Sequence, residues 1–395
     1  MKVFVVNCGS SSLKYQLIDS ETEEVIAKGL CERIGIDGKL THKPTGGETV
    51  ERQLDMSDHQ KAVSYVLEAL TDEKSGVISE LSAIDAVGHR IVHGGEKFAG
   101  SVVITDEVIA AIEECNDLAP LHNPANLIGI SACRALMPNV PMVAVFDTAF
   151  HQTMPKEAYL YGLPYEYYEQ YKVRKYGFHG TSHSFVSARL IELLGKQNAE
   201  SKVIVCHLGN GSSVTAVKDG KSVDTSMGFT PLDGLIMGTR SGSLDPAIVQ
   251  YLAGKLSVSL DEVLSILNKK SGVAGVSGVS SDFRDLDQAS RDGNERADIA
   301  LKMFAYRTAQ FVGAYAASLN GVDAIAFTAG IGENNAKMRE EICTYLGYLG
   351  VELDPAANAV RGEEIRISTE QSKVAVYVIP TNEELAIARE TVALV

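Results

Sequence analysis

The sequence lacks the cysteine pattern of a disulfide-bonded or zinc-binding protein. Its six cysteines are scattered over 395 residues, without a CxxC pair or a Cys/His cluster at zinc spacing. We therefore expect reduced, mostly structural thiols in a cytoplasmic protein. The cysteines are Cys8, Cys31, Cys115, Cys133, Cys206 and Cys343.

Long apolar runs and an excess of basic charge are also absent. The apolar run at residues 3–6 is too short for a signal-peptide core, and nothing elsewhere approaches a membrane span. Lys and Arg number 36 against 51 Asp and Glu, a net charge of −15. Because a nucleic-acid-binding protein needs a basic face, we do not expect nucleic acid as a partner. Because no segment approaches a membrane span, we do not expect a membrane as a partner either.

Two similar segments lie 200 residues apart, and each is predicted to form a strand, a tight polar turn and a second strand. Two readings are open: an internal duplication, or the chance alignment of any apolar strand followed by a Gly/Ser turn. We favour duplication, with one hairpin in each half. The matching pairs are Val3 and Val203, Val5 and Val205, Gly9 and Gly209, Ser12 and Ser212, and Asp19 and Asp219.

Strands and helices alternate over most of the remaining chain. Short apolar runs at 83–87, 142–145 and 324–327 predict strands buried on both faces. Helices are predicted at 60–70, at 294–319, at 383–394 and from Asn123 and Pro124, as cap and first-turn residue. The fold class is therefore α/β with helices flanking mixed sheets. We expect domains at 1–149 and 150–382, with the helix 383–395 joining the first.

The two predicted turns have the composition of phosphate-binding loops. Residues 7–12 read NCGSSS and residues 207–213 read HLGNGSS, which offer hydroxyls and backbone N–H groups. Either turn alone would more often be an ordinary hairpin. Two of them on opposed domains could hold a triphosphate, and no GxxxxGK[ST] loop is present to do so instead.

With AIAFTAGIGEN at 324–334, the order of these turns resembles the actin, Hsp70 and sugar-kinase superfamily. Along essentially its full length the chain resembles the acetate kinase (acetokinase) family. The segments that carry the resemblance are VNCGSSSLKYQL, GHRIVHGGEKF, FDTAFH, YGFHGTSH, CHLGNGSS, DTSMGFTPLDGLIMGTRSGSLDP, SDFRDL and PTNEEL. Cys8 stands where a small residue, often alanine, is expected.

The resemblance implies two duplicated actin-like (ribonuclease H-like) domains with a cleft between them. It also implies a homodimer that transfers the γ-phosphoryl group of ATP to acetate, giving acetyl phosphate and ADP, with Mg²⁺ or Mn²⁺. We expect direct in-line transfer, which is simpler than a phosphohistidine intermediate. Two alternatives stay open: a propionate or other short-chain carboxylate kinase, and a non-catalytic nucleotide switch of the actin or chaperone type.

Such a reaction needs cations more than a base. A carboxylic acid with a pKa of about 4 to 5 is already ionised at neutral pH, whereas the charge on the transferring phosphoryl group must be stabilised. The resemblance assigns Arg90 and Arg240 to this task. Most arginines form surface ion pairs, but Arg240 lies between glycines in a turn suited to reaching a ligand.

His179 and Asp147 are the other predicted catalytic residues. The resemblance gives His179 a hydrogen bond to phosphoryl oxygens, although a histidine beside glycines could simply pack in a turn. Asp147 has no proton that must move, so we expect it to orient an arginine or a metal-bound water. Its alternative role is to cap the turn that follows its strand.

Asn7 and Glu383 are implied as the magnesium residues, since Mg²⁺ keeps several waters and takes few protein ligands. Without the resemblance, Thr381 and Glu384 read as a capping box and Glu383 as a residue that favours the helix dipole.

The resemblance also implies nucleotide-binding and acetate-binding sets. The nucleotide set is Ser10, Ser12, Lys14, His207, Leu208, Gly209, Asn210, Gly211, Asp282, Phe283, Arg284, Gly330, Ile331, Gly332, Glu333 and Asn334. The acetate set is Arg90, Val92, Leu121, Phe178 and Pro231, of which the apolar members could equally be ordinary core.

Overall fold

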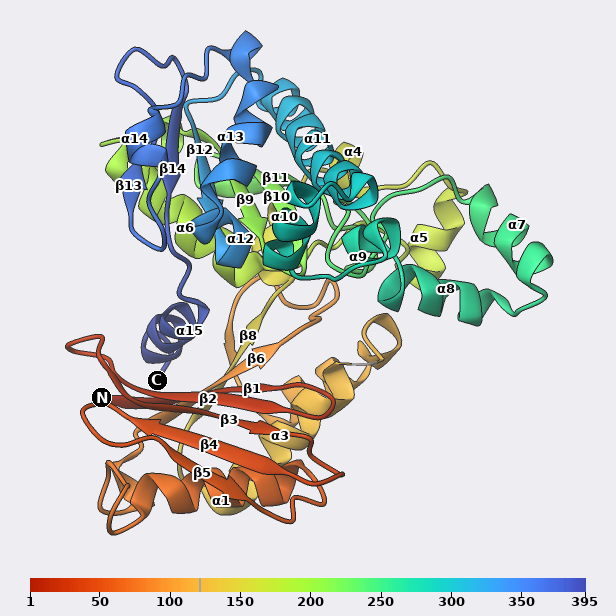
Figure 1. Ribbon diagram of the computed structural model, residues 1–395. Helices are drawn as coiled ribbons and strands as arrows, with labels where there is room; N and C mark the ends of the chain where they lie inside the picture. Colours follow the sequence, from red (N-terminus) through yellow and green to blue (C-terminus); the bar gives the residue numbers. More distant parts are fainter. Residues whose placement is uncertain (121) are drawn as a thin grey trace. The chain divides into compact units, whose positions relative to one another are not determined.

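The computed structural model describes residues 1–120 and 122–395. They form two compact units, Met1–Gln152 with Asn382–Val395, and Thr153–Thr381. Each unit contains one mixed sheet flanked by helices (Figure 1).

The first unit contains an eight-stranded sheet in the order β5-β4-β3-β2-β1-β6-β8-β7. Its strands are β1 (Lys2–Cys8), β2 (Leu13–Asp19), β3 (Val25–Glu32), β4 (Lys39–Pro44), β5 (Val50–Gln53), β6 (Ala86–Ile91), β7 (Val102–Val103) and β8 (Met142–Phe146). Its α-helices are α1 (His59–Thr71), α2 (Asp106–Glu113), α3 (Asn123–Leu136) and α15 (Glu383–Val392).

The second unit contains a six-stranded sheet in the order β11-β10-β9-β12-β14-β13. Its strands are β9 (Lys202–Leu208), β10 (Ser212–Lys218), β11 (Lys221–Thr225), β12 (Ala324–Thr328), β13 (Ile365–Arg366) and β14 (Ala375–Val378). Its α-helices are α4 (Lys156–Tyr159), α5 (Tyr165–Tyr171), α6 (Gly180–Leu193), α7 (Ala247–Leu256), α8 (Leu260–Lys269), α9 (Gly272–Ser277), α10 (Phe283–Arg291), α11 (Glu295–Ser318), α12 (Ala329–Asn334), α13 (Ala336–Thr344) and α14 (Pro355–Asn358).

The two sheets share one topology. The order β3-β2-β1-β6-β8-β7 of the first unit matches β11-β10-β9-β12-β14-β13 of the second. In both units a hairpin, β1–β2 or β9–β10, is followed by a parallel neighbour of its first strand, β6 or β12. A chance alignment of two turns would not reproduce the order of all six strands, so the structure supports an internal duplication.

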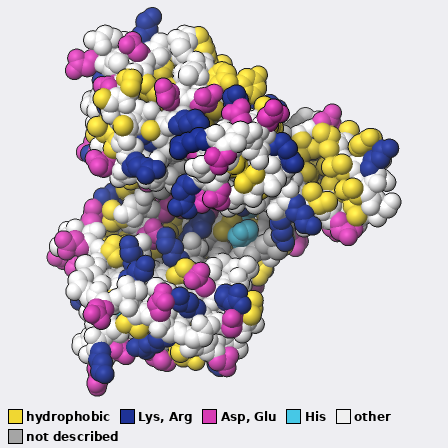
Figure 2. Space-filling view, in the orientation of Figure 1, with side chains coloured by type: hydrophobic (Ala, Val, Ile, Leu, Met, Phe, Trp, Pro, Cys, Tyr) yellow, Lys and Arg dark blue, Asp and Glu magenta, His cyan; other side chains and the backbone are white. Residues whose placement is uncertain are grey.

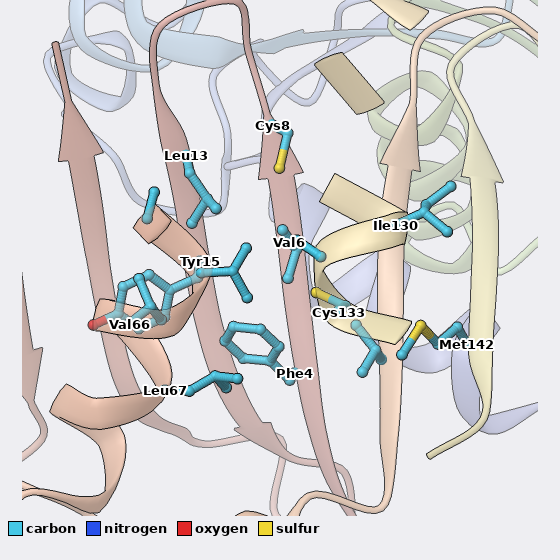
Figure 3. Packing of buried hydrophobic residues seen from close by; sticks show 14 of the residues in the cluster. Phe4, Val6, Cys8, Leu13, Tyr15, Val66, Leu67, Ile130, Cys133 and Met142 are labelled. Atoms are coloured by element: carbon cyan, nitrogen blue, oxygen red, sulfur yellow. The ribbon is translucent and has the colours of Figure 1, made fainter. Parts of the chain in front are cut away.

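The first unit buries both faces of its central strands. Phe4 and Val6 of β1 point to a core that α1 and α3 cover (Figure 3). Val3 and Val5 point to the opposite face, where they pack with Ile387 of α15. Burial on both faces explains why such strands read as unbroken apolar runs.

The second unit is built around the long helix α11. Its buried residues Phe304 and Val312 lie in one core cluster with Ile204 and Cys206 of β9. Asn294 caps the helix by accepting a hydrogen bond from the N–H of Ala297 at 3.0 Å. This agrees with the helix predicted at 294–319.

Two local predictions are wrong. The strand expected at 83–87 begins only at Ala86, because Leu81–Ala83 forms a 3₁₀ turn. Asn123 does not cap α3: His122 occupies the N-cap position, and the side chain of Asn123 turns to the backbone of His93.

All six cysteines are buried free thiols. In the described part of the chain, no helix combines the length and the apolar character that crossing a bilayer requires.

Candidate active site

The first unit places Arg90 and Asp147 together. Arg90 lies on β6, and Asp147 follows β8, the parallel neighbour of β6. Because parallel strands end at the same edge of a sheet, the two side chains meet there. Arg90 donates from Nε to Oδ1 at 3.0 Å and from Nη2 to Oδ2 at 2.6 Å. Asp147 is 2% exposed and Arg90 25% exposed, so the carboxylate is buried while the arginine side chain stays partly accessible.

The charges of this pair shift two pKa values, that of Arg90 itself and that of a neighbouring carboxyl. The Asp147 charge raises the pKa of Arg90. Burial raises the pKa of Glu383, the first residue of α15, and the charges of Asp147 and Glu384 add to the rise, while Arg90 and Lys14 oppose it. Glu383 is therefore a carboxylate in an environment that a further cation would stabilise.

The start of α15 differs from the predicted capping box. Asn382 is the N-cap and accepts a hydrogen bond from the N–H of Leu385 at 3.0 Å. Thr381 instead places its hydroxyl 2.8 Å from that of Ser182, and Glu384 forms an ion pair with Lys14. The Thr381 and Glu384 capping box is thus wrong, because a better cap lies one residue later.

The turn between β1 and β2 has the expected compact geometry. The N–H of Gly9 donates to the carbonyl of Ser12 at 2.8 Å, and His59 donates from Nε2 to the carbonyl of Gly9 at 2.7 Å. Ser10 is exposed, and Asn7 lies opposite Lys14 in the hairpin.

The second unit places three histidines around two serines. The hydroxyl of Ser213 lies 2.9 Å from Nδ1 of His179 and 2.7 Å from Nε2 of His183. His207 stacks on His179 with ring centroids 4.2 Å apart, and its Nδ1 lies 2.8 Å from the hydroxyl of Ser182. His179 itself has a φ of +57°, an uncommon conformation for a non-glycine residue that marks a constrained position.

His179 and Arg240 converge on Gly211. A methyl group on Gly211 would lie 3.4 Å from Nη1 of Arg240 and 3.5 Å from Nε2 of His179. Arg240 donates to the carbonyl of Pro231 at 3.3 Å, and burial lowers its pKa. Among the described residues it has no carboxylate partner. A partly buried cation without a counter-ion, next to a histidine and a glycine turn, is suited to receive an anion.

A cavity of about 790 Å³ lies in the second unit. Eight residues of the predicted nucleotide set line it: Gly209, Asn210, Asp282, Phe283, Arg284, Gly330, Ile331 and Asn334. The other second-unit members, His207, Leu208, Gly211, Gly332 and Glu333, are not among its lining residues.

Glu333 turns back into its own unit. Its Oε1 accepts hydrogen bonds from the N–H groups of Ala329 at 2.8 Å and Thr381 at 3.1 Å. Ala329 has a φ of +63°, a strained conformation for alanine. Glu333 thus holds the first residue of α12, the helix that carries Gly330, Ile331 and Asn334 of the cavity wall.

The sequence interpretation missed several cavity residues: Ser281, Asp287, Arg291, Asn335, Ala336, Lys337, Ala359 and Arg361. A signal existed for two of them, because Asp287 and Arg291 lie three and seven residues after Arg284 and share one face of α10. Asn335, Ala336 and Lys337 directly follow the GIGEN motif. Ala359 and Arg361 come from a loop that carries no motif.

The predicted acetate residues are distributed over both units. Val92 is 7% exposed and Phe178 3% exposed. Pro231 contacts Arg240, as described above. Leu121 lies outside the described residues.

Comparisons with known proteins agree along the whole chain. A profile of the acetokinase family matches residues 2–389. The acetate kinase of Lachnoclostridium phytofermentans is 66% identical over 395 residues, with 100% of both chains covered. The chain belongs to the acetokinase family.

Solved structures support this family assignment. The crystal structure of Porphyromonas gingivalis acetate kinase has a TM-score of 0.97 at 49% identity, covering 100% of this chain and 99% of that one. A propionate kinase from Francisella tularensis has a TM-score of 0.93 at 43% identity, with 100% of both chains covered.

Membership in the acetokinase family confirms the predicted α/β fold and the predicted enzyme class, a kinase that transfers phosphate to a carboxylate. It decides against the non-catalytic nucleotide switch.

Proposed function

We propose that this chain transfers the γ-phosphoryl group of ATP to acetate, reversibly, in one in-line step. The observation that carries the proposal is the convergence of Arg240 and His179 on Gly211. An incoming phosphoryl group develops charge on its equatorial oxygens. A partly buried guanidinium and an imidazole at a glycine, where no side chain blocks the approach, would stabilise that charge.

The carboxylate acceptor needs orientation rather than deprotonation. Both oxygens of Asp147 are engaged by Arg90, which supports an orienting role for Asp147 and leaves the outer face of Arg90 for an acetate oxygen. Val92, two residues later, would contact the methyl group. Propionate remains the alternative acceptor, since one methylene changes binding by about 1 to 3 kcal/mol.

The nucleotide would occupy the 790 Å³ cavity of the second unit. Gly330 has no atom near the position of a Cβ, so a ring or ribose can approach the backbone there. Arg291 and Arg361 supply positive charge along the same cavity, whereas Arg284 and Lys337 are paired there with Asp282 and Asp287.

Direct transfer predicts inversion at phosphorus. With ATP made chiral at the γ-phosphorus, acetyl phosphate is expected with net inversion, because a single displacement inverts the centre. Phosphorus stereochemical analysis of the product provides the measurement. Net retention would mean two displacements and a covalent phosphohistidine, for which His179 or His207 would be the sites.

Asn7 and Glu383 are proposed to hold Mg²⁺, or Mn²⁺, with the nucleotide phosphates. Among residues 1–120 and 122–395 no three His, Cys, Asp or Glu side chains cluster as a metal cage. A metal bound mainly by water and phosphate needs only one or two carboxylates, and Glu383 fits because it forms no salt bridge within the described chain. When bound, the metal would neutralise charge on the phosphate oxygens.

Replacing Glu383 with glutamine is expected to raise the Mg²⁺ concentration needed for half-maximal rate by about tenfold or more, because the charge that favours the cation is removed. Titration of the rate with Mg²⁺ at saturating ATP measures this. Glu390→Gln is the matched control, since Glu390 lies on the same helix and contacts Ser101. An unchanged Mg²⁺ requirement in Glu383→Gln would remove Glu383 from the metal site.

We also propose a homodimer and a cytoplasmic location. Helix α7 has no buried residue, and three of its apolar side chains face solvent. Ile248, Tyr251 and Leu256 are 42%, 63% and 51% exposed. Figure 2 shows hydrophobic side chains gathered over α7 and α8. Apolar patches of this kind commonly mark protein interfaces, which supports the homodimer. The six free thiols suit a reducing compartment, which supports the cytoplasmic location.

A further inference from the structure

Helix α3 carries two buried asparagines on one face. Asn123 is 0% exposed and Asn126 2% exposed. Burying an amide is costly unless both its donor and its acceptor are satisfied. The partners of these two amides therefore indicate what they are for.

Both side chains hold the backbone that follows β6. Asn126 accepts the N–H of Val92 at Oδ1, 3.1 Å away. Asn123 accepts the N–H of His93 at Oδ1, 3.1 Å away, and donates to the carbonyl of His93 at 2.9 Å. Thr148 accepts the N–H of Gly94 at 3.1 Å. Three successive N–H groups are thus held by buried side chains rather than by a strand.

Asn126 also binds a second backbone segment besides the one that follows β6. Its Nδ2 donates to the carbonyl of Cys8 at 2.7 Å. Cys8 ends β1 and directly precedes the turn at 9–12, whereas Val92 follows Arg90 at the end of β6. One amide therefore links two backbone segments 84 residues apart in sequence, and each carries residues assigned above to ligands.

We infer that Asn126 is a positioning residue for the acceptor carboxylate: it fixes the end of β6, with Arg90 and Val92, against the end of β1. The inference rests on the proposed placement of the carboxylate at Arg90 and Val92. Asn126 touches no substrate itself. Its effect is to hold Val92 and the guanidinium of Arg90 at a fixed distance from the turn at residues 9–12.

A misplacement of about 1 Å in such a site can cost about a hundredfold in rate. Asn126→Leu removes both hydrogen bonds, whereas Asn126→Asp keeps the acceptor for the N–H of Val92 and loses the donor to the carbonyl of Cys8. Tyr15→Phe is the control for lost stability, because it breaks the buried hydrogen bond between Tyr15 and His42 in the same unit.

The measurement is kcat and KM for acetate and propionate, KM for ATP, and Tm for each variant. For Asn126→Leu we expect a KM for acetate about tenfold higher or more and a clear loss of preference between acetate and propionate. Because its hydrogen bond to Cys8 is lost, Asn126→Asp should shift the KM for acetate and the preference in the same direction as Asn126→Leu. Tyr15→Phe should lower Tm and leave both carboxylate constants within about twofold of wild type.

A wild-type KM for acetate and a wild-type preference in Asn126→Leu would overturn the inference, and so would a wild-type preference in Asn126→Asp. If Asn126→Leu does not fold, Asn126→Ser replaces it under the same criteria. Val92→Ala distinguishes a failure of the inference about Asn126 from a failure of the proposed methyl-binding site. An unchanged preference between acetate and propionate in Val92→Ala would refute the methyl contact. A raised KM for acetate in Asn126→Leu would still support the positioning of Arg90.

Discussion

Replacing Arg240 with alanine is expected to lower kcat by about 10³- to 10⁵-fold, the range found when an arginine that stabilises the transferring phosphoryl group is lost. Arg240 is partly buried, has no carboxylate partner within the described chain, and lies beside His179 at Gly211. Its charge is therefore available for the anion that develops in the transition state. Because this interaction strengthens as the reaction proceeds, KM should change much less than kcat.

Steady-state kinetics with acetate and ATP measure this effect. Arg189→Ala is the matched control, since Arg189 lies in the same unit and forms surface ion pairs with Glu192 and Glu364. Such pairs contribute little to stability, and the control should turn over like the wild type. A kcat for Arg240→Ala within about tenfold of wild type would rule out the proposed role.

Arg90→Ala is expected to lower kcat/KM for acetate by about 10³-fold, because it removes the guanidinium that binds the acetate carboxylate and orients it. It should also destabilise the protein by about 3 to 5 kcal/mol, since the carboxylate of Asp147, 2% exposed, would lose its counter-ion. The two effects must be separated experimentally.

The double variant Arg90→Ala with Asp147→Ala separates them. It removes the unpaired buried charge, so Tm should recover while kcat/KM for acetate stays low. Thermal unfolding and initial rates on both variants provide the measurements. Recovery of activity in the double variant would show that Arg90 acts only by neutralising Asp147.

Much of the fold was predictable because it follows from local patterns. The runs at 142–145 and 324–327 became β8 and β12, since strands buried on both faces leave an unbroken apolar signal. The 200-residue offset predicted two hairpins, and the strand order of the two sheets agrees with it.

Polar side chains with distant partners were not predictable in this way. Asn123 precedes a proline and has the composition of a cap, yet its amide binds the backbone of His93, 30 residues earlier. Glu333 belongs to the GIGEN motif, yet its carboxylate binds Ala329 and Thr381. In both cases a tertiary partner decides between two uses of one side chain, and the sequence does not show which partner is near.

The candidate site likewise has residues that the sequence predicts and residues that only the fold brings to it. The resemblance to the acetokinase family supplied the glycine turns and the arginines, because these lie within contiguous motifs. It did not supply Arg361 or Lys337 of the cavity wall, whose places depend on how the segments after α12 fold back onto it.

The central claim, that the chain forms an acyl phosphate from ATP and acetate, is tested most directly by trapping the product with hydroxylamine while ADP is measured in parallel. We predict acetyl hydroxamate in step with ADP, dependent on ATP, acetate and Mg²⁺. Release of ADP without hydroxamate, or no product of either kind from the wild-type protein, would contradict it.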